Sequence, residues 1–281
     1  MLRIECDEVE VTVDPWMGGG ILSFTWRGID IFRPSVGHGG PLGLASFPLV
    51  PFCNRIAAGC VPYRGKPWML QPAPLGIEPV HALHGIGWRS PWSTIETGER
   101  FVRLGLKHDG TLWPWAFSSE QRLQASPEGF AFSMSATNND TSPMPTGLGL
   151  HPYFPRKDAR IELGARAIWE MGQDRLPTNR RELSRTPNWF DKKGLDHCFE
   201  CDALPFTIAW PTHRLFVRPS KNLAFTHVYT PSGEDFFCIE PVSHIPNAVN
   251  STLHRSVTGH VMLEPGETME IECRFLVEEL L

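Results

Sequence analysis

The chain has 281 residues, and its 26 prolines and 25 glycines exceed the about 12 % that these two residues make up in average proteins. Because they are spread along the whole chain, they indicate many turns in a globular protein. Lysine and arginine number 26 against 31 aspartate and glutamate residues, a formal net charge of −5, which argues against a basic nucleic-acid-binding surface.

Alternating apolar and polar residues predict β-strands along most of the chain. In chain order these segments are 9–13, 102–106, 132–136, 215–217, 223–229 and 269–277. No segment shows the i, i+3, i+4 stripe of an amphipathic helix. Many short strands separated by turns predict an all-β fold, a large sandwich or barrel. Without a linker or repeat, we expect one domain over 1–281.

The location of the protein is predicted from what the sequence lacks. No apolar run approaches the ~20 residues that span a bilayer. The first eight residues, MLRIECDE, carry no signal-peptide pattern. The seven cysteines stand at irregular spacings and read as free thiols of a reducing compartment. We therefore expect a cytoplasmic protein with no membrane and no nucleic-acid partner.

Three patterns that could suggest a cofactor are incomplete. The C-x-x-C at 198–201 lacks both a second cysteine pair and a βαβ context. The H-x-x-H at 81–84 has no third ligand within sequence reach. The G-x-G at 147–149 is followed by Pro152 where a dinucleotide-binding loop needs glycine. We expect no metal and no cofactor.

His151 and Glu240 are candidates for proton transfer, and each immediately precedes a proline. A residue before proline is held extended, so both side chains should project from stiff backbone. Glu240 also ends the apolar run 236–239, which should raise its pKa above the usual ~4.3. A nearby carboxylate should raise the pKa of His151 above ~6.5. Considered alone, His151 fits a hydrogen-bonded core histidine better than a catalytic group, and Glu240 fits an exposed strand end better than a catalytic group.

The ordered set of such segments resembles the aldose 1-epimerase, or galactose mutarotase, family. Its motifs appear in the family's order and span almost the whole chain. They are Asn54-Arg55, His84-Gly85, His151-Pro152-Tyr153-Phe154, Leu195-Asp196-His197, Glu240-Pro241 with Pro246 and Asn250, and the strand entry at 263–267. The resemblance implies a large antiparallel β-sandwich, in agreement with the predicted strands.

The resemblance also implies roles for individual residues. Glu240 corresponds to the general base, His151 to the general acid, and His84 to a second histidine that binds the sugar near its ring oxygen. Arg55 and Asp196 correspond to residues that hydrogen-bond sugar hydroxyls, and Asn54 is grouped with them as substrate-binding. Two departures from the family pattern, Pro155 after the Tyr-Phe pair and the Trp-Pro-Trp at 113–115, leave the identity of the sugar open.

The predicted activity is therefore that of an isomerase, an aldose 1-epimerase that interconverts the anomers of a monosaccharide. Only proton transfers are required, with Glu240 on the acidic and His151 on the basic limb of the pH profile. One alternative is a hexose-phosphate epimerase on the same fold, for which Arg89 is the only basic residue beside a candidate motif. Another is a carbohydrate-binding protein without activity. The sequence leaves open whether the protein is a monomer or a homodimer.

Overall fold

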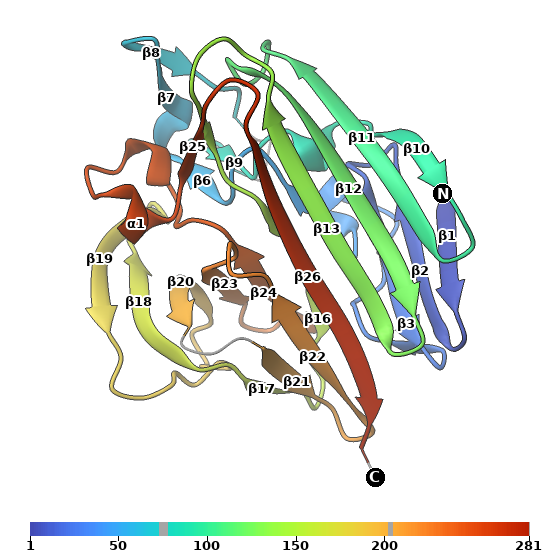
Figure 1. Ribbon diagram of the computed structural model, residues 1–281. Coiled ribbons are helices and arrows are strands. Elements are labelled where there is room, and N and C mark those ends of the chain that lie inside the picture. The colour runs from blue at the N-terminus through green and yellow to red at the C-terminus, as the bar shows by residue number, and fades with distance from the viewer. Residues whose placement is uncertain (73–77, 202–204, 281) are drawn as a thin grey trace.

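The computed structural model describes residues 1–72, 78–201 and 205–280, and their regular secondary structure is mostly antiparallel β-sheet (Figure 1). One sheet of eight strands has the order β10-β11-β12-β13-β26-β22-β21-β17. Its strands are β10 (Ser93–Thr97), β11 (Phe101–Asp109), β12 (Ala116–Ser126), β13 (Gly129–Asn138), β26 (Thr268–Glu279), β22 (His213–Pro219), β21 (Phe206–Ala209) and β17 (Arg160–Glu162). We call it the long sheet.

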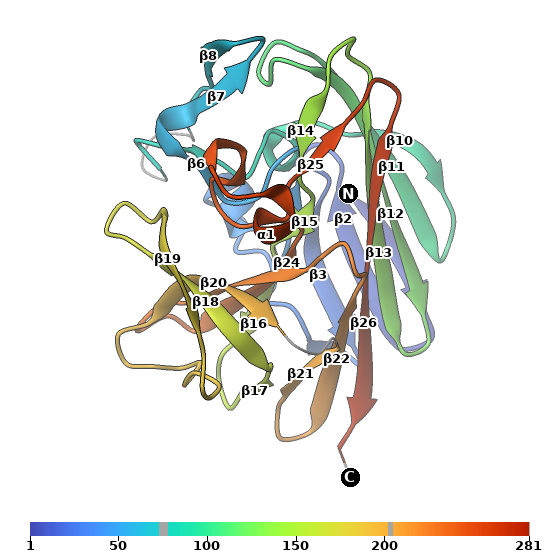
Figure 2. The same cartoon turned by 60° about the vertical axis from the view of Figure 1, so that its left-hand side comes forward.

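The other large sheet has the order β19-β18-β20-β23-β24-β15-β5, and β16 also pairs with β24. We call it the site sheet. Its strands are β19 (Pro177–Glu182), β18 (Ala165–Met171), β20 (Leu195–Cys201), β23 (Phe225–Thr230), β24 (Phe236–Val242), β15 (Gly149–Leu150), β5 (Pro48–Leu49) and β16 (Tyr153–Pro155). Figure 2 shows the long sheet nearly edge-on, with β18, β20 and β24 beside it.

The remaining described strands form smaller sheets. A four-stranded sheet has the order β1 (Leu2–Cys6), β2 (Val9–Asp14), β3 (Gly20–Trp26) and β4 (Ile29–Asp30). Three two-stranded pairs are β14 (Met144–Thr146) with β25 (Val261–Leu263), β6 (Arg55–Ile56) with β9 (Ala82–Leu83), and β7 (Cys60–Tyr63) with β8 (Lys66–Met69).

Helix is scarce, as the sequence predicted. The one α-helix within the described ranges is α1 (Arg255–Thr258). Short 3-10 turns occur at Gly40–Gly43, Ala57–Gly59, Gly87–Arg89 and Ala248–Asn250. None of these helices is long and apolar enough to cross a membrane.

The predicted strands are confirmed, and the burial pattern explains them. In β26 the apolar residues of the predicted alternation are buried, whereas Glu270 and Arg274 are exposed. Phe132 of β13 lies opposite Cys273 of β26, so both predicted alternations share one core face. The strand predicted at 223–229 begins at Phe225. The extent of the domain over 1–281 stays a prediction, although each large sheet draws strands from both halves of the chain.

An aromatic cluster around Phe32 joins three sheets. The ring of Phe32 makes edge contacts with Phe24 of β3, with Phe130 and Phe275 of the long sheet, and with Phe154 of β16, at 5.1–5.9 Å between ring centroids. Such pairs each contribute about 0.5–1.5 kcal/mol beyond the burial of their area. The cluster therefore fixes the position of β16, and with it the segment that begins at His151.

The Trp-Pro-Trp segment at 113–115 connects β11 and β12 and belongs to the core. Both indole rings are buried, and their centroids lie 5.1 Å apart. Trp113 also packs on Phe52, and Trp115 meets the ring of Tyr63 edge-on. The segment is therefore a packing element that supports the turn after Pro51.

Candidate active site

The six residues predicted for the site lie around one cavity of about 550 Å³ on the site sheet. They come from far-apart parts of the chain and are brought together by the fold. They are Asn54, Arg55, His84, His151, Asp196 and Glu240.

The register of the site sheet explains why three of its strands serve this cavity. His227 of β23 lies opposite Cys198 of β20 on one side and opposite Glu240 of β24 on the other. Asp196 stands two residues before Cys198, so its side chain lies on the same sheet face as His227 and Glu240. Tyr153 of β16 pairs with Cys238 and extends this face.

Glu240 and His151, the base and acid predicted from the sequence, are in contact at the wall of the cavity. Glu240 Oε1 lies 3.2 Å from His151 Nε2. Only 1 % of Glu240 and 6 % of His151 is exposed, so solvent hardly screens the pair. Glu240 Oε2 and His151 Nδ1 are buried without a hydrogen-bond partner. Unpaired buried polar atoms are rare in folded proteins, and they favour a role in binding or catalysis here.

Burial moves the pKa values of the two groups in opposite directions. It raises the pKa of Glu240 to about 7, as expected from the apolar run before it. Burial, together with the positive charge of His227, lowers the pKa of His151 to about 3. The expectation that a neighbouring carboxylate would raise the pKa of His151 is therefore wrong. The loss of hydration on burial is the largest cause of both shifts, so the neutral forms of both groups are favoured.

Aromatic rings hold His151 in place. Its imidazole stacks on Phe47 with 4.5 Å between centroids and on Tyr153 with 4.8 Å. The ring of His84 meets His151 edge-on at 5.1 Å. His84 Nδ1 is also buried without a hydrogen-bond partner. The two histidines thus present a fixed right angle of rings to the cavity, as expected for preorganised catalytic groups.

The backbone conformation explains why glycine follows His84 in the sequence. Both residues have positive φ, 57° and 75°. A Cβ on Gly85 would lie 2.1 Å from the carbonyl oxygen of Val50, so only glycine fits beside the backbone at Val50. The His84 amide donates to the carbonyl of Asn54 at 2.8 Å, which joins two of the predicted motifs directly.

Arg55 is buried and held by two acceptors. Its Nε donates to Glu78 Oε2 at 2.7 Å, and its Nη1 donates to Asn54 Oδ1 at 3.2 Å. Asn54 Oδ1 also accepts from the Arg55 amide at 3.0 Å. Glu78 was not predicted, because nothing in its sequence neighbourhood indicates that it meets Arg55.

Asp196 is held by a second buried histidine. His227 Nε2 donates to Asp196 Oδ1 at 2.7 Å. Although burial opposes both shifts, this bond lowers the pKa of Asp196 to about 2 and raises the pKa of His227 above its ordinary value. His227 lies inside a predicted strand, and its role follows only from the strand register.

Two arginines that were not predicted from the sequence also line the cavity. They are Arg33 and Arg175. Arg89, the one basic residue considered for a phosphate site, does not line it, and its Nη1 donates to the carbonyl of Pro72 instead. The sequence gives no signal for Arg33, since it lies far along the chain from every motif.

His81, of the H-x-x-H pattern set aside in the sequence, has structural hydrogen-bond partners. His81 Nδ1 accepts from the Ala58 amide at 3.0 Å, and its Nε2 lies 3.0 Å from the carbonyl of Asp174. Within the described part of the chain, no group of three or more histidine, cysteine, aspartate or glutamate residues could hold a metal ion. The absence of a cofactor stays a prediction.

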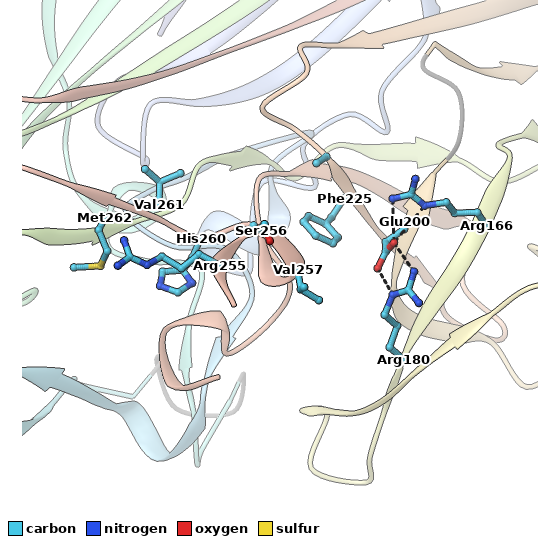
Figure 3. A pocket seen from close by; sticks show the side chains of 12 residues that line it. Arg166, Arg180, Glu200, Phe225, Arg255, Ser256, Val257, His260, Val261 and Met262 are labelled. Atoms are coloured by element: carbon cyan, nitrogen blue, oxygen red, sulfur yellow. Dashed lines mark hydrogen bonds and ion pairs between the residues drawn. The ribbon is translucent and has the colours of Figure 1, made fainter. Parts of the chain in front are cut away.

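A second cavity, of about 820 Å³, lies beside α1 (Figure 3). Its carboxylate, Glu200, is engaged by Arg166 at 3.1 Å, by Arg180 at 2.7 Å and by Trp169 Nε1 at 3.0 Å. A carboxylate bound so fully is not available for proton transfer. This cluster instead ties β18, β19 and β20 together.

Comparisons with known proteins agree with this fold. The sequence model described as aldose 1-epimerase matches residues 5–276, so the chain belongs to the aldose 1-epimerase family. Among curated proteins it is similar to the uncharacterized protein YphB of Escherichia coli K12, with 28 % identity over 93 % of this chain and 94 % of YphB. It is also similar to the uncharacterized protein YihR of the same organism, with 26 % identity over 84 % of this chain and 81 % of YihR.

Among solved structures, a galactose mutarotase-like protein from Clostridium acetobutylicum has the same fold. The TM-score is 0.88 with 18 % identity, covering 99 % of this chain and 95 % of that one. This likeness confirms the predicted β-sandwich of the galactose mutarotase type.

Proposed function

We propose that the protein is a mutarotase that interconverts the α- and β-anomers of a free aldose. The observation that carries the proposal is the 3.2 Å contact between Glu240 Oε1 and His151 Nε2 at the wall of the cavity. A carboxyl group and an imidazole in contact supply both the base and the acid that this chemistry needs. The cavity of about 550 Å³ also has the size typical of a small-molecule site.

The reaction opens and closes the hemiacetal ring by proton transfer. Glu240 takes the proton of the anomeric hydroxyl while His151 donates a proton to the ring oxygen. The bond between C1 and the ring oxygen then breaks, and an open aldehyde forms. Rotation about the C1–C2 bond presents the other face of the aldehyde, and the same transfers in reverse close the ring.

The pair must carry one proton throughout this cycle. Because the pKa of Glu240 is about 7 and that of His151 about 3, the resting proton lies on Glu240. The 3.2 Å contact gives it a direct route to His151. That transfer creates the carboxylate base and the imidazolium acid together. A pair that has lost the proton cannot donate to the ring oxygen.

The other residues bind the sugar in this proposal. His84 hydrogen-bonds near the ring oxygen, because its ring stands edge-on to His151. Arg55 and Asp196 hold hydroxyl groups through charge-assisted hydrogen bonds, which are the stronger kind. Asn54 uses its Oδ1 to orient Arg55, which leaves its amide nitrogen for the sugar.

The test is the optical rotation of freshly dissolved α-glucose or α-galactose with purified protein. The proposal expects faster relaxation to the anomeric equilibrium than in buffer. The Glu240→Gln variant should lose about 10²–10⁴ in kcat, because Gln keeps the volume but cannot accept the proton. Glu128→Gln serves as the matched control, since Glu128 is exposed and outside the cavity.

A carbohydrate-binding protein without activity is the competing reading. It would bind a sugar without accelerating relaxation, and Glu240→Gln would then change affinity alone. A variant that keeps more than about a third of the wild-type kcat would contradict the role of Glu240, since that loss is under about 1 kcal/mol of barrier.

A further inference from the structure

Arg33 differs from the other arginines of the cavity because no carboxylate neutralises it. Arg55 is paired with Glu78 at 2.7 Å, and Arg175 Nε lies 4.0 Å from Asp196 Oδ2. Among the described residues, no carboxylate oxygen lies within 4.0 Å of the Arg33 guanidinium. Its Nη2 donates instead to two neutral acceptors, the carbonyls of Leu42 and Leu44, at 3.2 and 2.8 Å.

The Arg33 guanidinium is nevertheless held in a fixed position. It lies over the ring of Tyr153 at 4.2 Å and over the ring of Phe236 at 4.9 Å. Its Nε is buried without a hydrogen-bond partner. Arg33 is half-buried, and even partial burial of a cation without a counter-charge is costly; stacking on two rings returns only part of that cost. A side chain fixed in this way at a cavity wall is suited to bind an anion that arrives from solution.

The position of Arg33 relative to the reacting atoms indicates which part of a sugar it could reach. Arg33 and His151 both pack against the ring of Tyr153, with His151 at 4.8 Å. In the proposed reaction His151 protonates the ring oxygen, and Glu240 acts at C1. The ring oxygen is bonded only to C1 and C5. The substituent that extends toward Arg33 is therefore the one on C5.

We propose that the cavity takes an aldose whose C5 substituent ends in an anionic group, and that Arg33 binds this group. The proposal rests on the mutarotase function above and names its substrate class. The guanidinium fork matches the paired oxygens of a phosphate ester, a sulfonate or a carboxylate. All three present the same chemistry, and a matched series of sugars distinguishes them.

The main experiment measures anomer exchange at equilibrium by magnetisation-transfer NMR, with the uncatalysed exchange subtracted. The series is glucose, glucose 6-phosphate, 6-deoxy-6-sulfoglucose and glucuronate. We expect kcat/KM for at least one anionic sugar to exceed that for glucose by about 10- to 100-fold, the range of a hydrogen bond to a charged group. The sugar with the largest advantage identifies the anionic group.

Variants then assign the advantage to Arg33. Arg33→Gln should remove at least tenfold of the preference for the anionic sugar over glucose. Arg33→Lys should restore part of it, because lysine keeps the charge and loses the planar fork. Arg160→Gln is the control, since Arg160 is an exposed arginine away from the cavity. If Arg33→Gln lowers kcat/KM for glucose and for the anionic sugar by one common factor, the assignment is wrong.

A binding measurement on the wild-type protein covers the case in which these variants do not fold. 1,5-Anhydroglucitol 6-phosphate and 1,5-anhydroglucitol cannot mutarotate, because neither has an anomeric hydroxyl. The proposal expects at least tenfold tighter binding of the phosphate, weakened by added salt. Equal affinities, together with equal kcat/KM values for charged and neutral sugars, would overturn it. If no aldose exchanges at all, the mutarotase proposal fails, while this comparison still decides whether Arg33 binds an anion.

Discussion

His227 and Glu240 face each other across the β23–β24 pairing, and His227 reaches Asp196 with its Nε2 at 2.7 Å. One buried imidazole therefore lies between the proposed base and a proposed sugar-binding carboxylate. Its positive charge lowers the pKa of both groups against the effect of burial. The proton affinity of Glu240 depends in this way on a residue that does not take part in the reaction.

Replacing His227 should therefore shift the pH profile. In His227→Gln the pKa of Glu240 should rise, because the cation that opposes its protonation is removed. The descending limb of kcat against pH should move to higher pH, and KM should rise as Asp196 loses its donor. A descending limb that stays in place or moves to lower pH would contradict this role. His213→Gln, at a buried histidine of the long sheet, is the control.

The activity proposed for the wild-type protein should have a bell-shaped pH profile with limbs governed by the Glu240–His151 pair. The two pKa values reverse the limbs expected from the sequence. Activity should fall as pH rises through about 7, because the pair then loses its one proton from Glu240. It should fall again toward pH about 3, where His151 takes a second proton. The limbs report constants of the pair, so His151→Asn is needed to assign them. If the acidic limb survives in His151→Asn, another group, with His84 the nearest, governs it.

Glu240 should cost the folded protein stability at high pH. Its pKa of about 7, against an ordinary value of 4.5, means that the unfolded chain loses this proton first. The penalty is absent below pH 4.5 and complete above pH about 7, where it reaches about 3 kcal/mol. Glu240→Gln should therefore unfold at a higher temperature than wild type at pH 8 and show a smaller difference at pH 4. A difference independent of pH would show that ionisation of Glu240 is not its cause.

Glu78 should act on binding through Arg55. Glu78→Gln keeps an acceptor for Arg55 Nε but removes the charge, so the guanidinium is held less firmly. We expect KM for the sugar to rise several-fold while kcat changes little. Steady-state exchange rates over a range of sugar concentrations separate the two constants. A fall in kcat at constant KM would place Arg55 in the chemical step instead. Glu162→Gln, on an exposed strand of the long sheet, is the control.

The sequence predicted the parts of this structure that depend on local pattern. The alternation in β26 is strict because one face packs in the core. His151 and Glu240 could be identified because each precedes a proline in a family motif. The partners of these groups could not be predicted, since His227 meets Asp196 only through strand register and Arg33 meets Tyr153 only through loop packing. The direction of the pKa shift of His151 was wrongly predicted. The family motifs indicate that the Glu240 carboxyl lies near His151, but the sequence does not show how deeply both are buried.

The proposed base Glu240 lies on a paired strand, whereas Arg33, the group proposed to select the substrate, lies on a loop. Glu240 and His227 are fixed by ladder hydrogen bonds between β23 and β24, whereas Arg33 follows β4 and is held through the carbonyls of Leu42 and Leu44. Substitutions in 33–44 can therefore alter which sugar is accepted while the distance from Glu240 to His151 stays the same. Proteins with this arrangement can change the sugar that they accept while the residues proposed for proton transfer stay the same. Exchange of segment 33–44 between relatives is therefore a direct route to new specificities.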